Sequence, residues 1–215
     1  MSPTTGKDKY PSMAMMQAEH KEGTSYRIRT LDRKSPVTIL SPHGGFIEPG
    51  TSALSRAIAG TQFNLFDFQG LVQTNPLDLH ITSTRFRHRK LSTLLAQSQT
   101  AVSVHCMFDE GDETIYIGGL NRPLKERLAR SLQKAGFSVD PDPPVYKGIK
   151  TTNVTNQVKL GGVQLELPAK LLCSMFDSSK QFSLDNEAIT PGLRFKKFKN
   201  ATRNVLLEFS AREVA

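Results

Sequence analysis

Short apolar segments alternate with helical segments along most of this chain, and this alternation restricts the possible folds more than any other feature. An apolar run of about four to eight residues between turn residues is typical of a buried strand. Leucines spaced four apart are typical of one face of a helix. Strands joined by helices favour parallel pairing. The sequence therefore predicts a single-domain α/β fold with a mixed, mostly parallel central sheet flanked by helices.

The same patterns place the individual elements. We expect strands at residues 25–31, 37–40, 63–68, 79–84, 100–106, 114–119, 137–139 and 162–168. We expect helices at residues 51–59, 88–98 and 120–137, and a basic helix near the end with Phe195, Phe198, Val205, Leu206 and Phe209 on one face. Thr51 or Ser52 would cap the first helix, and glycines at 60 and 136 would end the first and third. Residues 41–51 (SPHGGFIEPGT) and 140–150 are expected to be loops.

Length and composition exclude several protein classes. A chain of 215 residues with 38% hydrophobic residues can bury a core, so it is not disordered throughout. We assign residues 1–23, which are polar and aperiodic, to a loose N-terminal lead-in, and residues 24–215 to the folded domain. No run approaches the roughly 18 apolar residues of a membrane span, and no secretory signal is evident, so we expect a cytoplasmic protein. Cys106 and Cys173 are expected to be reduced thiols.

The net charge of +8 suits an acidic partner, either nucleic acid, an anionic polymer or an acidic peptide. Basic clusters with interleaved phenylalanines, at residues 85–90 and 194–203, leave open a module that binds nucleic acid without catalysis. The chain has no zinc-finger spacing, phosphate-binding glycine loop or aromatic RNA-binding motif. We therefore favour the interpretation that the C-terminal phenylalanines face the core and the lysines face water.

Polar side chains break the apolar pattern where the strands end. His43 and Glu48 follow the strand at 37–40, His105 ends the strand at 100–106, and Glu166 lies within an apolar strand. Parallel sheets hold their sites at the carboxyl ends of strands. Two imidazoles and one carboxylate can bind zinc with one position open for water, and a further carboxylate can accept a proton. Taken singly, such a histidine is more often an ordinary hydrogen-bonding residue and such a glutamate is usually solvated, so only the joint pattern indicates a metal site.

At these residues the chain resembles the phage poly-γ-glutamate hydrolase family, which is related in fold to zinc carboxypeptidases. The matching runs, in order, are SPHGGFIEPGT, LHITST, AVSVHC, IGGLNRPL with its helix, and GGVQLELP. The resemblance implies a carboxypeptidase-like sheet and one Zn²⁺ ion held by His43, Glu48 and His105. It implies that Glu166 is the catalytic carboxylate.

The implied reaction is hydrolysis of a γ-glutamyl amide bond, in which Glu166 takes a proton from zinc-activated water and returns it to the leaving amine. The implied partner is an anionic γ-glutamyl polymer or peptide, and the positive net charge fits it. We expect a monomer that binds neither membrane nor nucleic acid. A phage enzyme of this kind would be released by host lysis without an export signal.

The chain departs from the family at two places. Residues 85–90 are basic where relatives usually carry an acidic run, and Asn156 is followed by Gln157 where an arginine is usual. Arg85 could supply the missing charge, and the other candidate substrate contacts are His80, Asn156 and Asn121. For His80 we favour a structural role over a catalytic one, and Cys106 should point away from the metal. These departures leave open a related zinc amidohydrolase or peptidase that acts on cell-wall γ-glutamyl peptides or N-acyl-glutamate.

Overall fold

A seven-stranded mixed sheet forms the centre of the computed structural model, which describes residues 8–108, 112–176 and 191–214. The strands are β1 (Tyr26–Leu31), β2 (Val37–Gly45), β3 (Asn64–Gly70), β4 (Thr100–Met107), β5 (Ile115–Gly118), β6 (Val139–Asp140) and β7 (Val163–Pro168). Their order is β1-β3-β2-β4-β7-β5-β6. Only the β1–β3 and β5–β7 pairs are antiparallel, so the prediction of a mostly parallel sheet is confirmed.

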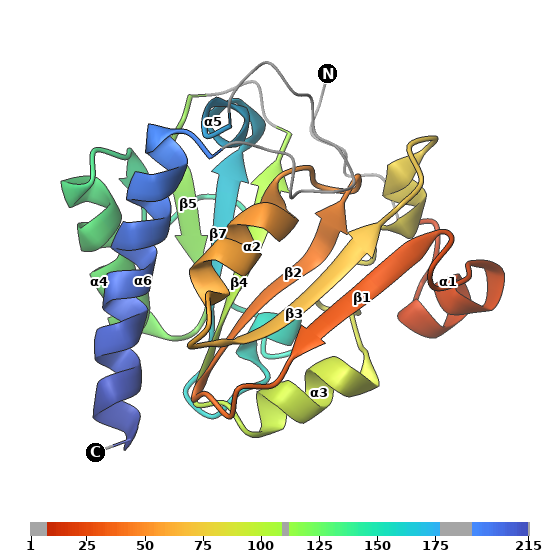
Figure 1. Cartoon of the computed structure of the whole chain (residues 1–215), viewed down its shortest axis with the longest axis horizontal. Coiled ribbons are helices and arrows are strands. Elements are labelled where there is room, and N and C mark those ends of the chain that lie inside the picture. The colour runs from red at the N-terminus through yellow and green to blue at the C-terminus, as the bar shows by residue number, and fades with distance from the viewer. Residues whose placement is uncertain (1–7, 109–111, 177–190, 215) are drawn as a thin grey trace.

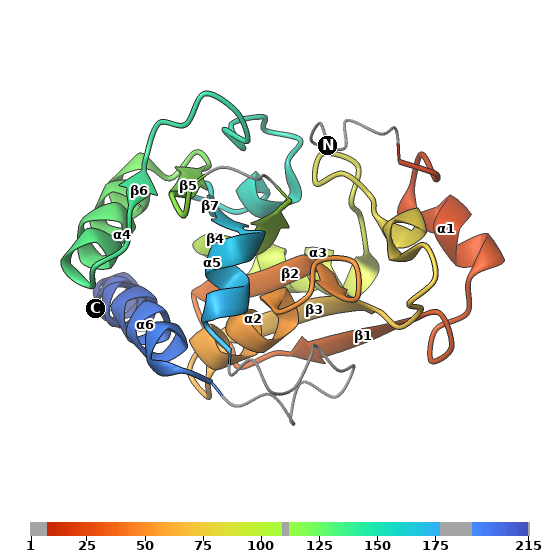
Figure 2. The same cartoon turned by 90° about the horizontal axis from the view of Figure 1, so that it is seen from above.

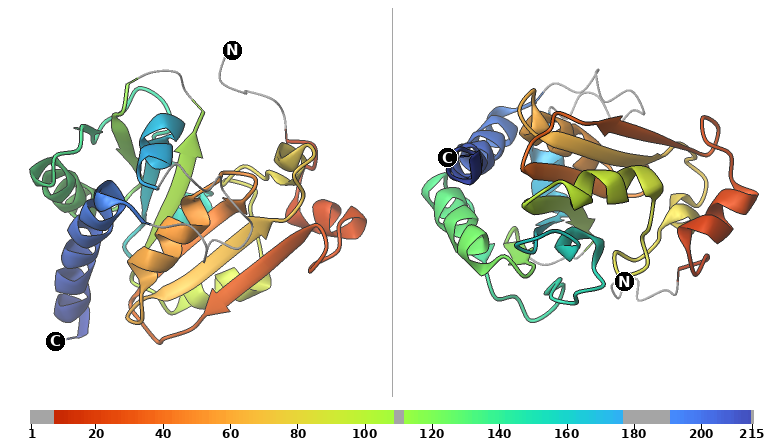
Figure 3. Two further views of the ribbon diagram at one scale, coloured as in Figure 1. Left: turned by 45° about the horizontal axis from the view of Figure 1, so that its top comes forward. Right: turned by 90° about the horizontal axis from the view of Figure 1, so that it is seen from below.

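Helices cover both faces of this sheet (Figures 1 and 2). They are α1 (Met13–Glu19), α2 (Thr51–Ala59), α3 (Arg89–Ala96), α4 (Arg122–Lys134), α5 (Ala169–Ser174) and α6 (Leu193–Val214), with 3₁₀ turns η1 (Pro76–Leu79) and η2 (Val154–Asn156). The orange helix α2 lies in front of the sheet in one view of Figure 3, and the yellow-green helix α3 lies in front in the other. A separate apolar cluster fills each side. The result is a three-layer α/β domain, as expected.

The basic C-terminal helix α6 packs its phenylalanines into the core. Phe195 and Phe198 are buried there together with Leu206, and Phe209 contacts the same cluster. Lys196 and Lys197 face solvent. The predicted division between an apolar and a basic face is confirmed, so these phenylalanines are not available for stacking on nucleic-acid bases.

The predicted strand at residues 79–84 is wrong. Leu79 ends the turn η1, and the following segment forms a loop in which the Thr82 carbonyl accepts hydrogen bonds from the backbone amides of Arg85 and Phe86. Leu79 and Ile81 are buried in an apolar cluster. This burial explains the alternating pattern. A loop that buries every second side chain has the same apolar period as a strand, although its backbone does not pair with a neighbouring strand.

Strand β2 is longer than predicted, and the start of α2 differs. β2 continues to Gly45, so His43 lies in the strand and not in the loop after it. A Cβ atom at Gly44 would lie 2.1 Å from the Ser52 Oγ, so only glycine allows the strand to pass so close to α2. The N-cap of α2 is Gly50 at φ +94°, not Thr51 or Ser52. The Thr51 hydroxyl instead donates to the Glu48 carbonyl.

The described part of the N-terminal segment is not loose. It contains α1, whose Met13 and Met16 side chains are buried, and the Ser12 hydroxyl caps this helix by accepting from the Met15 amide. Methionine fills irregular apolar gaps, so two inward-facing methionines anchor a helix that shows no clear period. The expectation of a loose lead-in is therefore wrong for residues 13–19.

Both cysteines are free thiols, as expected, with Cys106 buried and Cys173 exposed. Among the described residues, no helix has both the length and the apolar character that crossing a membrane requires.

Candidate active site

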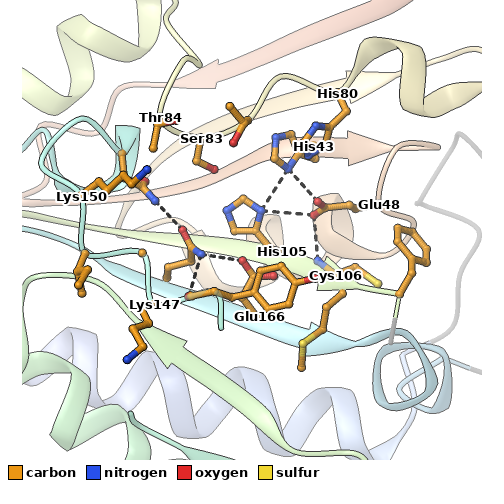
Figure 4. A pocket seen from close by; sticks show the side chains of 18 of the residues that line it. His43, Glu48, His80, Ser83, Thr84, His105, Cys106, Lys147, Lys150 and Glu166 are labelled. Carbon is orange, nitrogen blue, oxygen red and sulfur yellow. Dashed lines mark hydrogen bonds and ion pairs between the residues drawn. The ribbon is translucent and has the colours of Figure 1, made fainter. Parts of the chain in front are cut away.

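Three adjacent parallel strands bring the predicted site residues to one edge of the sheet. His43 lies near the end of β2, His105 near the end of β4 and Glu166 near the end of β7. Glu48 joins them from the tight turn after β2, where its amide donates to the His43 carbonyl at 2.8 Å. All four residues are at most 6% exposed. Figure 4 shows their side chains converging on one space.

His43, Glu48 and His105 form a compact donor set. The His43 Nδ1 lies 2.8 Å from a Glu48 oxygen and 3.2 Å from the His105 Nδ1. The second Glu48 oxygen lies 3.6 Å from the His105 Nδ1. The three ligand atoms all lie within 4.8 Å of one another. Two imidazole nitrogens and one carboxylate oxygen are a typical ligand set of catalytic zinc sites.

Hydrogen bonds around the donors favour the forms that bind a metal. The His43 Nε2 lies 2.9 Å from the Ile81 carbonyl, which can only accept, so Nε2 carries the proton and Nδ1 presents a lone pair. That lone pair faces the Glu48 carboxylate, and two acceptors at this distance repel each other unless a cation or proton lies between them. The second Glu48 oxygen accepts from the Cys106 amide at 2.9 Å. The arrangement therefore fits a metal cation.

The pKa values follow from burial and from this clustering of charge. Burial, as the largest cause, and the nearby His80, as the second, lower the pKa of His43 to about 4, so its imidazole is neutral at pH 7. Burial alone would raise the pKa of Glu48, but His43 and His105 outweigh it and hold this pKa below its ordinary value. Burial lowers the pKa of His105, whereas Glu166 and Glu48 raise it to a net increase.

Glu166 stands beside the donor set with a different electrostatic environment. Burial raises its pKa from 4.5 to about 7. One carboxylate oxygen accepts from the Gln164 amide at 2.7 Å, and Asn153 in turn donates to the Gln164 carbonyl oxygen at 2.8 Å. Strand alternation predicted that Gln164 and Glu166 share a face, and this is confirmed. A carboxyl group that titrates near neutral pH is suited to accept and return a proton.

A cavity of about 450 Å³ opens over these four residues. Its lining includes residues 82–84 from the loop after η1 and residues 146–150 from the loop after β6. Its lining also includes exposed apolar side chains, namely Leu77, Phe108, Tyr146 and Ile149. The site is therefore a polar floor at the sheet edge under a partly apolar mouth.

Of the four candidate substrate contacts, only His80 lines the cavity. Its ring centroid lies 4.0 Å from that of His43, and its Nδ1 lies 2.7 Å from the Asp8 carboxylate. Arg85 donates to the same carboxylate at 2.5 Å and lies outside the cavity lining. Sequence reasoning missed Asp8, which also accepts from the Thr82 amide at 2.8 Å.

Asn121 and Asn156 have structural positions. Asn121 caps α4 by accepting from the Leu124 amide, and its side-chain amide donates to Thr100 at the opposite end of β4 from His105. Its prediction as a substrate contact at this site is wrong, because the capping motif places it at the other sheet edge. Asn156 is buried and donates to the carbonyls of Gly148 and Lys150, so it holds the wall of the cavity without lining it.

Cys106 follows His105 on β4 and belongs to the cavity lining, where its backbone amide donates to Glu48, but its side chain is part of the apolar cluster on the opposite face of the sheet. Burial raises the pKa of its thiol well above the ordinary value. The expectation that it points away from the metal ligands is confirmed, and a neutral buried thiol is a poor nucleophile.

Comparisons with known proteins agree with this geometry. A family model described as poly-gamma-glutamate hydrolase matches residues 10–201. The UPF0714 protein YndL of Bacillus subtilis (strain 168) is 32% identical over 183 residues, which cover 83% of this chain and 70% of YndL. A bacteriophage poly-gamma-glutamate hydrolase of known structure superimposes with a TM-score of 0.88 at 25% identity, covering 94% of this chain and 98% of that chain.

A second solved structure, described as "YNDL-apo (Zinc-free)", superimposes with a TM-score of 0.85 at 29% identity, covering 94% of this chain and 99% of that chain. An N-formylglutamate amidohydrolase from Ralstonia eutropha JMP134 shares the fold more distantly, with a TM-score of 0.50 at 12% identity over 88% of this chain and 99% of that chain.

Proposed function

Because this chain belongs to the poly-γ-glutamate hydrolase family, we propose that it cleaves the γ-glutamyl amide bonds of poly-γ-glutamate by zinc-dependent hydrolysis. The observation that carries this proposal is the convergence of the His43, Glu48 and His105 ligand atoms within 4.8 Å, beside the buried carboxyl group of Glu166. A metal site next to a carboxyl group of raised pKa is one arrangement that can hydrolyse an amide bond.

One zinc ion is the metal that the donor set favours. Two nitrogens and one oxygen make three protein ligands, which leaves a coordination position for the reaction. The relative YndL has a solved structure described as its zinc-free form, which supports the same ion in this chain. The hydrogen bond from His43 to the Ile81 carbonyl would orient the ring and strengthen its nitrogen as a ligand.

The protein's own groups would carry the proton steps. A bound zinc ion supplies Lewis acidity toward a carbonyl oxygen and toward water. Glu166 would take one proton from the attacking water and pass it to the nitrogen of the leaving amine as the C–N bond breaks. Gln164 occupies one Glu166 oxygen, so the other oxygen is left for this exchange. Gln164 thus acts as a positioning residue.

All residues of the proposed site come from one chain, so we also propose that the monomer is active. Light scattering during gel filtration, with activity measured across the peak, would test this directly. Activity confined to a larger species would contradict it.

Incubation of the purified protein with poly-γ-glutamate, followed by measurement of polymer length, tests the function. We expect the chains to shorten, the reaction to stop with a chelator, and activity to return when zinc is added back. His105→Ala should lose both zinc and activity. A zinc-loaded protein that leaves the polymer intact while cleaving short γ-glutamyl peptides would contradict poly-γ-glutamate as the substrate.

A further inference from the structure

If this protein cleaves a γ-linked glutamate chain, as proposed above, the substrate brings free carboxylates to the site, and a positively charged side chain there would favour its binding. Every residue of such a chain keeps a free α-carboxylate. On the leaving side, this carboxylate is attached to the carbon that bears the scissile nitrogen. The negative charge therefore enters the cavity together with the bond to be broken, and an unpaired charge in a partly buried site is unfavourable.

Arg85, which the sequence suggested for this task, is already paired. Its guanidinium donates to Asp8 at 2.5 Å, and the same carboxylate binds His80 and the Thr82 amide. Asp8 thereby holds the loop that forms one wall of the cavity. Recruiting Arg85 to the substrate would break this anchor.

Lys150 is the cation that the cavity offers. It lines the cavity, its side chain is exposed, and the described residues give it no acidic partner. Figure 4 shows its side chain directed into the cavity, toward the wall that contains Ser83 and Thr84. Lys147 also belongs to the lining, but its ammonium group points away from Glu166 in the same view.

The backbone of Lys150 is fixed to the network that holds Glu166. The Lys150 carbonyl accepts from the Asn156 side chain and from the Asn153 amide, each at 2.9 Å. The Asn153 side chain binds Gln164, which binds Glu166. The base of the lysine side chain and the proposed proton-transfer group are therefore held by one set of hydrogen bonds, which reduces the ordering required on binding.

The apolar mouth of the cavity fits the rest of the same substrate. The backbone of a γ-linked chain contains two methylene groups per residue. Phe108 and Ile149 line the cavity and are 49% and 55% exposed, so they offer apolar surface to these methylenes.

We propose that the Lys150 ammonium group binds the α-carboxylate of the glutamate residue that supplies the leaving amine. Lys150 is thus a substrate-binding residue that favours γ-linked glutamate over amides without a carboxylate at that position. Asn156 is a positioning residue that acts through the loop at residues 148–150.

The test is binding of an uncleaved γ-glutamate oligomer to the zinc-loaded Glu166→Gln protein, measured by calorimetry. Adding Lys150→Met should weaken binding about tenfold, the size expected for one charge-assisted hydrogen bond. Lys150→Arg should restore affinity to within about threefold, since it keeps the charge. Lys159→Met, at an exposed lysine outside the cavity lining, is the matched control and should leave binding unchanged.

A second pair of ligands identifies the carboxylate. A γ-glutamyl-glutamate probe is compared with an analogue in which a carboxamide replaces the α-carboxylate of the leaving residue. The parent protein should prefer the carboxylate about tenfold, and Lys150→Met should remove this preference. Equal discrimination by both proteins, equal binding by Lys150→Met and Lys159→Met, or no oligomer binding at all would overturn the proposal. Normal oligomer binding with no cleavage by the wild type would contradict only the proposed function.

Discussion

His105 and Glu166 lie directly opposite each other in the register of two neighbouring parallel strands, β4 and β7. Parallel strands place such a pair on the same face of the sheet, so the register alone sets a candidate metal ligand beside a candidate proton acceptor. Their charges are coupled in consequence, since Glu166 raises the pKa of His105 against the opposing effect of burial.

Replacing Glu166 by glutamine should separate metal binding from catalysis. Glu166→Gln keeps the size of the side chain but removes the group that exchanges protons. We expect kcat on poly-γ-glutamate to fall by about 10²- to 10⁴-fold, the usual contribution of a general base. Zinc content should match that of the wild type, because Glu166 is not in the donor set. Activity within a few-fold of wild type would contradict the assigned role.

The fall of kcat/KM on the acid side of its pH profile should report the protonation of Glu166. Burial raises the pKa of this carboxyl group from 4.5 to about 7, and a bound cation nearby would lower it again. The protonated carboxyl group cannot accept a proton, so kcat/KM should fall as the pH falls through an apparent pKa between 4.5 and about 7. A profile that stays flat down to pH 4.5 would show that the essential base is another group.

Removing the charge of Asp8 should loosen the cavity wall at residues 80–85. Asp8→Asn replaces one acceptor oxygen of a carboxylate that binds His80, Thr82 and Arg85. We expect the free energy of unfolding to fall by about 1–3 kcal/mol in urea titrations and KM to rise. The salt bridge between Lys34 and Asp32 lies in the turn between β1 and β2, away from Asp8, and is exposed at its lysine, so Lys34→Met is a control that should cost much less.

The contribution of Asp8 to the free energy of unfolding should be lost in acid. Its hydrogen bonds, with His80 first, outweigh the effect of burial and hold its pKa below the ordinary 3.8. A lowered native pKa contributes stability above the unfolded pKa, and this contribution disappears as the pH falls through the native value. The difference in unfolding free energy between wild type and Asp8→Asn should therefore shrink below pH 3.8. A difference that stays constant there would contradict this account.

Helix α1 should contribute to the stability of the domain. Met13 is 2% exposed within an apolar cluster, whereas Met15 on the same helix is 53% exposed. We expect Met13→Ala to lower the free energy of unfolding by about 2–4 kcal/mol, because it leaves a cavity. Met15→Ala should change it by less than about 0.5 kcal/mol. Equal effects of the two substitutions would show that α1 does not pack as described.

The sequence predicted the sheet and the four polar residues at its edge because strand ends carry a strong signal. His105 and Glu166 each interrupt an apolar run, and parallel pairing then brings those runs together. Their roles in metal binding and catalysis stay predictions. The strand expected at residues 79–84 was wrong because burial of Leu79 and Ile81 imitates the strand period without a pairing partner.

The remaining features depend on long-range contacts without a local pattern. Asp8 reaches His80 across 72 residues of sequence, from a segment with no helical or strand period. Lys150 lies in a proline-containing loop whose course is set by a hydrogen bond from Asn156. Nothing in the neighbouring residues of either position indicates the contact, so only the folded chain reveals it.

Metal analysis after equilibrium dialysis against zinc tests the central claim most directly. The wild type should retain about one zinc ion per chain, as a site with three protein ligands requires. Glu166→Gln should retain the same amount, and His105→Ala should retain almost none while still giving the circular dichroism spectrum of a folded protein. Zinc that stays bound in folded His105→Ala, or a wild type that binds none, would contradict a metal site built from His43, Glu48 and His105.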